Sequence, residues 1–195
     1  NQGTQNAMDP ARRLVVDRLP ASDARSVIDL VLGGEQLSQD LMDDLLERAD
    51  GVPLYLEELA RNVSAQDPGD RAAIPSTLAE VITARLDRLG ATRTIAQLAS
   101  VIGREFDRIV LRGLCGLDDD TLDKHVWRLS EHAIVDPLDE SGAMLCFRHA
   151  LIHQAAYQSL TQAERRRAHS FLADALVGAG RADTEPQLAA HHLAA

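Results

Sequence analysis

Short aliphatic segments with helical spacing, each followed by glycine, constrain this chain more than any other feature of its sequence. Apolar residues recur three and four positions apart after Ser38 and again from Thr92 to Ile102, and Gly51 and Gly103 follow these two segments. Glycine readily adopts the left-handed conformation in which many helices end, so the pattern predicts a series of short packed helices. With one Trp, two Tyr and three Phe, the core must be largely aliphatic. We therefore expect a mainly α fold.

The basic residues exclude one large class of enzymes. Of the 20 basic residues only Lys124 is a lysine, against 30 acidic residues and a formal net charge of -10. A P-loop needs a lysine directly after glycine to reach the β and γ phosphates of a nucleotide, and the chain has no such pair. The 195 residues therefore cannot form a P-loop ATPase by themselves.

Other composition limits concern the cell compartment. Cys115 and Cys146 are too few for a disulfide framework or a four-cysteine zinc site, and we interpret them as reduced thiols. No stretch approaches the roughly 20 apolar residues that cross a bilayer, and the N-terminus has no basic region followed by an apolar one. We expect a cytoplasmic protein without a membrane role. Residues 1–11 are polar and aperiodic, and we interpret them as an expression remnant or a disordered end.

Residues 12–67 are predicted to form a first, helical part. The run from Arg13 to Leu19 is compatible with a strand, and three short helices follow it. Pro53 suits the first turn of the third helix, where a missing N–H costs little. The segment from Gln66 to Ala72 is polar and contains Pro and Gly, which predicts a domain boundary.

Residues 72–160 are predicted to form a second part with a different pattern. Thr77 and Glu80 form a capping-box pair, and helical segments then continue to Glu131. The runs 133–138 and 144–148 resemble strands joined by a hairpin turn. Three helices followed by a two-stranded hairpin is the element order of a winged helix. From Thr161 a further helix is expected in residues 161–195, which we interpret as the start of a helical repeat region in a chain truncated at both ends.

Four segments carry a resemblance to a known family: Gly51 to Leu59 (GVPLYLEEL), Ile74 to Leu89 (IPSTLAEVITARLDRL), Ala99 to Phe106 (ASVIGREF) and Phe147 to Tyr157 (FRHALIHQAAY). In this order they resemble the STAND class of AAA-type signalling ATPases, particularly bacterial members attached to LuxR-type regulators or class III adenylate cyclases. The resemblance covers roughly residues 12–195.

The resemblance implies a multi-part nucleotide switch. Its P-loop domain would precede this chain, residues 12–67 would be the helical lid, 72–160 the winged helix and 161–195 the first helical repeats. ATP or ADP would bind through the P-loop domain, none being expected on these 195 residues alone. Partners would be that domain and further repeats of the same chain, with self-association on activation. The segment itself would not be an enzyme, although its full-length parent would be an ATPase.

The resemblance also implies nucleotide-contacting residues in the lid. Gly51, Val52 and Pro53 match the family's Gly-x-Pro motif, which lies beside the bound nucleotide. A helix N-terminus offers N–H groups and a positive dipole end, and the flat ring of Pro53 suits adenine. The alternative is structural: Gly51 ends one helix and Pro53 begins the next, as in many helical hairpins.

A second implied contact follows the inner strand of the hairpin. His149 matches the histidine of the family's Met-His-Asp motif, which contacts the β-phosphate of ADP. Arg148 and Ala150 flank it, so the motif's aspartate is absent, and Arg148 is a candidate contact to a phosphate or a neighbouring domain. Imidazole can donate to phosphate near neutral pH. The alternative is that His149 is a hydrogen-bond donor at the start of a helix.

Several other signals are set aside. His149 and His153 have the spacing of a zinc-binding helix, but Ala150 stands where the metalloprotease motif has glutamate, so we predict no metal site. No catalytic constellation is found. Trp127 is expected to anchor the core. The basic run from Arg165 to Arg167 is interpreted as a solvated helix face.

Two alternative functions stay open beside the nucleotide switch. One is a stand-alone helical module that binds a protein partner. The other is a DNA-binding winged helix, which local charge disfavours. Between Asp118 and His132 five acids face two bases, a net charge of -3 on the helix that would enter the major groove. The output domain, the inducing signal and the oligomeric state are not determined by the sequence.

Overall fold

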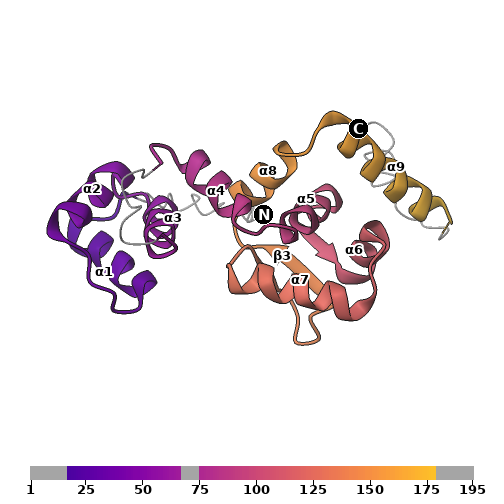
Figure 1. Ribbon diagram of the computed structural model, residues 1–195, viewed down its shortest axis with the longest axis horizontal. Helices are drawn as coiled ribbons and strands as arrows, with labels where there is room; N and C mark the ends of the chain where they lie inside the picture. Colours follow the sequence, from indigo (N-terminus) through magenta and orange to yellow (C-terminus); the bar gives the residue numbers. More distant parts are fainter. Residues whose placement is uncertain (1–16, 67–74, 179–195) are drawn as a thin grey trace, which may run out of the picture. The chain divides into compact units, whose positions relative to one another are not determined.

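A computed structural model describes residues 17–66 and 75–178 of the chain (Figure 1). The chain divides into two compact units, Asn1–Arg71 and Ala72–Ala195, and each is described by itself. The predicted end segment 1–11, most of the domain boundary and residues 179–195 of the predicted repeat region lie outside the described residues. The predicted strand Arg13–Leu19 is described only from Asp17, and that part is not in a strand.

The first unit contains α1 (Ala21–Leu32), α2 (Gln39–Ala49) and α3 (Pro53–Ser64) (Figure 1). The three predicted helices are thus confirmed. The hydroxyl of Ser38 accepts a hydrogen bond from the Leu41 N–H and caps α2, while Pro53 occupies the first turn of α3 as expected. The helices pack through fully buried aliphatic side chains, among them Ile28, Leu45, Leu56, Leu59 and Val63.

The second unit is helical with a small sheet. Its elements in chain order are α4 (Leu78–Asp87), α5 (Thr92–Ile102), β1 (Glu105–Asp107), α6 (Arg108–Cys115), α7 (Asp119–Glu131), β2 (Val135–Pro137), β3 (Met144–Phe147), α8 (Ala150–Gln158) and α9 (Gln162–Gly178). The capping box predicted from Thr77 and Glu80 is present at α4. Thr161 and Glu164 make the same reciprocal hydrogen bonds at the start of α9.

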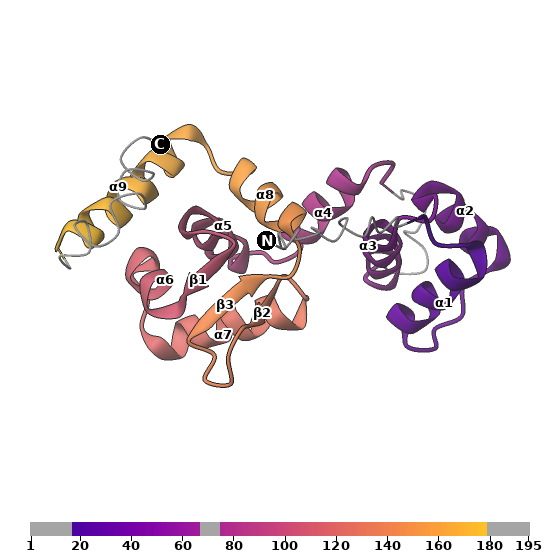
Figure 2. The ribbon, with the colours of Figure 1, turned by 180° about the vertical axis from the view of Figure 1, so that it is seen from behind.

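The sheet is antiparallel and has the strand order β1-β3-β2 (Figure 2). The predicted hairpin of β2 and β3 is confirmed, with Asp136 opposite Cys146. The sequence did not predict β1, which pairs Phe106 with Leu145 on the other side of β3. Three residues carry too little alternation to be recognised, so β1 depends on its partner strand. Side chains alternate across a sheet, which puts Phe106, Leu145 and Phe147 on one buried face.

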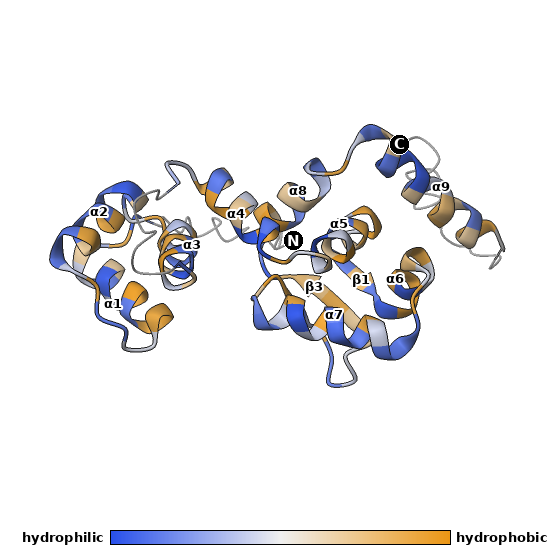
Figure 3. Cartoon of the chain, in the orientation of Figure 1, coloured by the Kyte–Doolittle hydropathy of each residue, from blue (hydrophilic) through white to orange (hydrophobic). Residues whose placement is uncertain are grey.

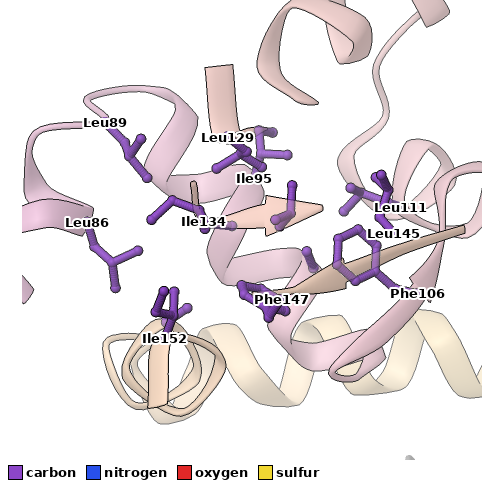
Figure 4. Close-up of a cluster of buried hydrophobic side chains, with 14 of the residues drawn as sticks. Leu86, Leu89, Ile95, Phe106, Leu111, Leu129, Ile134, Leu145, Phe147 and Ile152 are labelled. Atoms are coloured by element: carbon purple, nitrogen blue, oxygen red, sulfur yellow. The ribbon is translucent and has the colours of Figure 1, made fainter. Parts of the chain in front are cut away.

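This buried sheet face and helices α4 to α8 form a largely aliphatic core (Figure 4). The ring centroids of Phe106 and Phe147 lie 5.6 Å apart. Both rings belong to a buried cluster to which each of the helices α4 to α8 contributes at least one side chain. The labelled side chains include Leu86 and Leu89 from α4 and its end, Ile95 from α5, Leu111 from α6, Leu129 from α7 and Ile152 from α8. Figure 3 shows β3 as hydrophobic and α7 as largely hydrophilic, in keeping with a central strand and a surface helix.

Trp127 is not part of this core, so the expectation that it anchors the fold is wrong. It lies on α7 with 66% of its surface exposed, whereas Leu122 and Leu129 of the same helix are fully buried. A helix of this kind buries only one stripe, and the aliphatic residues occupy it. Among the described helices, none is both long enough and apolar enough to span a membrane.

Arg85 ties α4 to the end of α7 from a buried position. Its side chain is only 5% exposed, and the guanidinium donates hydrogen bonds to the carbonyl of His132 through Nε, at 3.0 Å, and through a terminal nitrogen. The last carbonyls of a helix have no partner within the helix. Arg85 therefore satisfies one of them where water has little access.

We expect Arg85→Met to destabilise the second unit by about 1 to 3 kcal/mol, because the His132 carbonyl loses a buried donor. Urea denaturation followed by circular dichroism measures the change. The matched control is Arg128→Met, an exposed arginine of α7, which should shift the unfolding free energy by less than about 0.5 kcal/mol. Equal losses for both variants would contradict the role given to Arg85.

Candidate functional site

The turn that carries the Gly-x-Pro residues joins α2 to α3. Asp50 and Gly51 both have positive φ, 46° and 69°, so two consecutive left-handed residues end α2. Val52 is extended and Pro53 begins α3. Left-handed backbone costs a residue with a Cβ energy that glycine does not incur, which accounts for Gly51 but leaves Asp50 strained.

Gly51 is also confined by the segment before α1. The Leu19 N–H donates to the Gly51 carbonyl at 2.9 Å, and a Cβ added to Gly51 would lie 2.6 Å from the Leu19 carbonyl oxygen. Arg18 donates to the Asp50 carbonyl at 3.1 Å and forms an ion pair with its carboxylate. The structural alternative for Gly51 is therefore supported, since the glycine lets the incoming chain lie against the turn.

Pro53 differs from Gly51 in its exposure to solvent. It is exposed at the N-terminus of α3, and no side chain caps this end of the helix. An uncapped helix N-terminus is electrostatically suited to an anionic group, and the exposed proline ring adds an apolar surface. Within the turn, Gly51 thus has a packing role while Pro53 is accessible to a ligand.

The interior of α3 holds polar residues that the sequence analysis did not single out. Glu58 and Asn62 are each only 1% exposed, and Gln66 donates to the Asn62 side-chain oxygen at 2.6 Å. Their spacing of four residues places them on one helix face beside the apolar stripe. This spacing is the sequence signal that could have identified the buried polar residues. It does not distinguish them from exposed polar residues, which show the same spacing on a helix surface.

The second candidate site lies where β3 leads into α8. His149 is the residue before α8, in an extended conformation, and its carbonyl accepts hydrogen bonds from the N–H groups of Ile152 and His153. Its imidazole does not cap the helix, and the residue is half-buried. The alternative that the imidazole is a donor at the helix start is not supported by this geometry.

Arg148 is held by a carboxylate that the sequence analysis missed. Nε donates to one oxygen of Asp136 at 2.8 Å and a terminal nitrogen donates to the other at 2.6 Å. The hydrogen bonds from Arg148 lower the pKa of Asp136, burial opposes the shift, and the charges of Arg148 and His149 lower it further. Only the register of β2 on β3 brings Asp136 to Arg148, so no local signal could have found the pair.

The two candidate sites lie in different units, Gly51 and Pro53 in the first and Arg148 and His149 in the second. The spacing of His149 and His153 has a structural explanation. Nε2 of His153 is 2.9 Å from the Ser100 carbonyl, and the ring meets Phe147 edge-on. Within the described ranges, no three His, Cys, Asp or Glu residues are grouped to hold a metal ion.

The acidic start of α7 is compensated by its neighbour α6. Arg112 binds the carboxylate of Asp119 at 2.7 and 2.8 Å, and Arg108 forms an ion pair with Asp123. Asp118 caps α7 through the Thr121 N–H, which lowers the pKa of its carboxyl. From Arg108 to Glu131 there are four bases and five acids, so the surface is close to neutral instead of strongly acidic.

The basic run at the start of α9 is not simply a solvated face. Arg165 donates to the Leu160 carbonyl at 3.2 and 3.0 Å, and its guanidinium lies 4.8 Å from the centre of the Tyr157 ring. Arg166 and Arg167 are exposed, as expected. The interpretation was therefore wrong for Arg165, which joins the end of α8 to α9.

The chain resembles an uncharacterized protein of Rhizobium meliloti strain 1021, to which it is 27% identical over 176 residues. The matched region is 84% of this chain and 17% of that protein, so the chain spans about a sixth of its relative's length. No family model matches the chain, and no solved structure matches it.

We expect Gly51→Ala to cost about 2 kcal/mol more in unfolding free energy than Gly33→Ala, because the Leu19 carbonyl must move. Gly33 is the matched control: it also has positive φ, 61°, but a Cβ there would meet nothing within 4 Å. Its substitution should cost about 1 kcal/mol, from the backbone conformation alone. Urea denaturation compares the two, and equal losses would contradict the confinement of Gly51.

We expect Asp136→Asn to destabilise the protein by about 1 kcal/mol or less at pH 7, because the ion pair is partly exposed. The pKa of Asp136 is lowered by folding, so its contribution is present above the ordinary carboxyl pKa and is lost as the pH falls through the lowered value. Wild type and variant should therefore converge in unfolding free energy once the pH lies below the lowered pKa. Denaturation across this pH range tests it, and a constant difference would refute it.

Proposed function

We propose that the chain is the lid and winged-helix segment of a STAND-type nucleotide switch. It would sense ATP or ADP bound to a P-loop domain outside these 195 residues and relay that state to an output domain, either a transcriptional regulator or an adenylate cyclase. The carrying observation is that Pro53 and His149, which match the family's nucleotide-contacting motifs, each stand at a helix N-terminus without a side-chain cap and are at least partly accessible.

The order of elements in the second unit supports the winged-helix part of the proposal. A helix, a strand, two helices and two strands follow one another as α5, β1, α6, α7, β2 and β3, and the sheet order is β1-β3-β2. A winged helix has this order of elements, with the β2–β3 hairpin as the wing. The unit would transmit a conformational change instead of reading DNA.

The mechanism follows from what each residue can offer. Pro53 and the N-terminus of α3 would contact the nucleotide from the lid, and His149 would donate a hydrogen bond to a phosphate from the second unit. A switch requires that these contacts differ between the ATP and ADP states, since a ligand shifts an equilibrium only through differential affinity. These residues bind and sense; hydrolysis would belong to the P-loop domain.

The exposure of Trp127 favours a second candidate, the protein-interaction module. Trp127 lines a shallow surface hollow with Asp123, Lys124 and Arg128, and exposed tryptophan is common where proteins bind one another. Direct DNA binding by α7 lacks the positive charge that phosphate contacts need, since the whole stretch from Arg108 to Glu131, which contains α6 and α7, has four bases against five acids. A P-loop encoded upstream of Arg12 would favour the switch, and its absence would favour the interaction module.

The first test uses the 195-residue chain. Because it lacks a phosphate-binding loop, we expect isothermal titration calorimetry to detect no binding of ATP or ADP at micromolar concentrations. Tight binding of ATP or ADP to this chain would refute the proposal that the P-loop domain supplies the nucleotide-binding site.

The second test uses the full-length protein. Loss of a hydrogen bond to a charged phosphate should weaken ADP binding about tenfold or more in His149→Ala. His132→Ala is the matched control, since it removes the same side chain at the C-terminal end of α7. Unchanged ADP affinity and basal activity in His149→Ala would overturn the assignment.

A further inference from the structure

The outward face of the sheet carries a charged pair next to His149. Side chains alternate along a strand, so Asp136 in β2, Cys146 in β3 and Arg148 just beyond β3 share one face. Glu105 of β1 lies on the other side of Cys146. The side chains of Asp136 and Arg148 are each 36% exposed, which leaves the pair within reach of a ligand from solvent.

The geometry gives Arg148 a partner that resembles a phosphate. Its Nε and a terminal nitrogen donate in parallel to the two oxygens of Asp136, at 2.8 and 2.6 Å. Two oxygens of a phosphate group offer the same spacing to a guanidinium and carry more negative charge. The edge of Arg148 that would bind a phosphate is therefore occupied by Asp136.

We propose that Asp136 and the phosphate of a bound nucleotide compete for Arg148. In the absence of nucleotide Arg148 rests on Asp136, and when ADP binds beside His149 the guanidinium transfers to its phosphate. This inference rests on the proposed contact between His149 and the nucleotide. Asp136 is thus a positioning residue that sets how tightly the site holds ADP.

Three observations make such an exchange feasible. The Arg148 N–H donates to the Ile134 carbonyl at 3.0 Å, so the backbone is held and only the side chain has to move. The pair is partly exposed, and ion pairs of this kind are weak enough for a stronger anion to displace. The charge of His149 also helps to lower the pKa of the Asp136 carboxyl, which indicates that the pair lies near the proposed phosphate contact.

The test is a double-mutant cycle on ADP affinity in the full-length protein. Asp136→Asn should raise ADP affinity about fivefold, the fold-change that matches a partly exposed ion pair. Arg148→Met should lower it, and in the Arg148→Met background Asp136→Asn should change affinity by about twofold or less, because the two residues act on each other. Arg148→Gln serves in place of Arg148→Met if circular dichroism shows the latter unfolded.

The matched control is Glu105→Gln, which removes the same charge from the same sheet face on the far side of Cys146 and should leave ADP affinity unchanged. If Asp136→Asn raises ADP affinity equally with and without Arg148, the carboxylate only repels the phosphate, and the proposal that Asp136 and phosphate compete for Arg148 is wrong. If His149→Ala weakens ADP binding while Asp136→Asn has no effect, the competition is wrong and the proposed function stands. If neither variant changes ADP affinity, the proposed function fails with it.

Discussion

Strand β3 holds the second unit together, because it is hydrogen-bonded on both sides and contributes to both faces of the sheet. It pairs with β1 and β2, and its inward residues Leu145 and Phe147 are buried in the core. The bonds extend past its end, since the Arg148 N–H reaches the Ile134 carbonyl. The register of this one strand therefore fixes where Arg148 and His149 lie.

A comparable constraint in the first unit is the close approach of the incoming chain to Gly51. The Leu19 N–H is hydrogen-bonded to the Gly51 carbonyl, and positive φ and crowding together exclude any larger residue without rearrangement. The same turn presents Pro53 to solvent. A glycine that the fold requires and an exposed proline that the proposed function assigns to the nucleotide thus lie two positions apart, and a variant of Gly51 would disturb both.

The helices could be predicted because their signals are local. Thr77 with Glu80 forms the capping box expected, and Gly51 and Gly103 follow helices that end there. Strand β1 and the position of Trp127 could not be predicted, for opposite reasons. The strand forms only because it pairs with a segment that is distant in the sequence. The tryptophan was expected in the core because it is apolar, but leucines occupy the buried face of α7.

By itself the sequence determined the helical character of the chain and the order of its helices, since caps and glycine stops act within a few residues, and the family resemblance named the candidate residues Pro53 and His149. Tertiary structure alone decided the partner of Arg148, because Asp136 is twelve residues away and meets it only through the register of a hairpin. It also pairs two acids of α7, Asp119 and Asp123, with arginines of another helix. Charge and chemistry at both places depend on which segments the fold brings together.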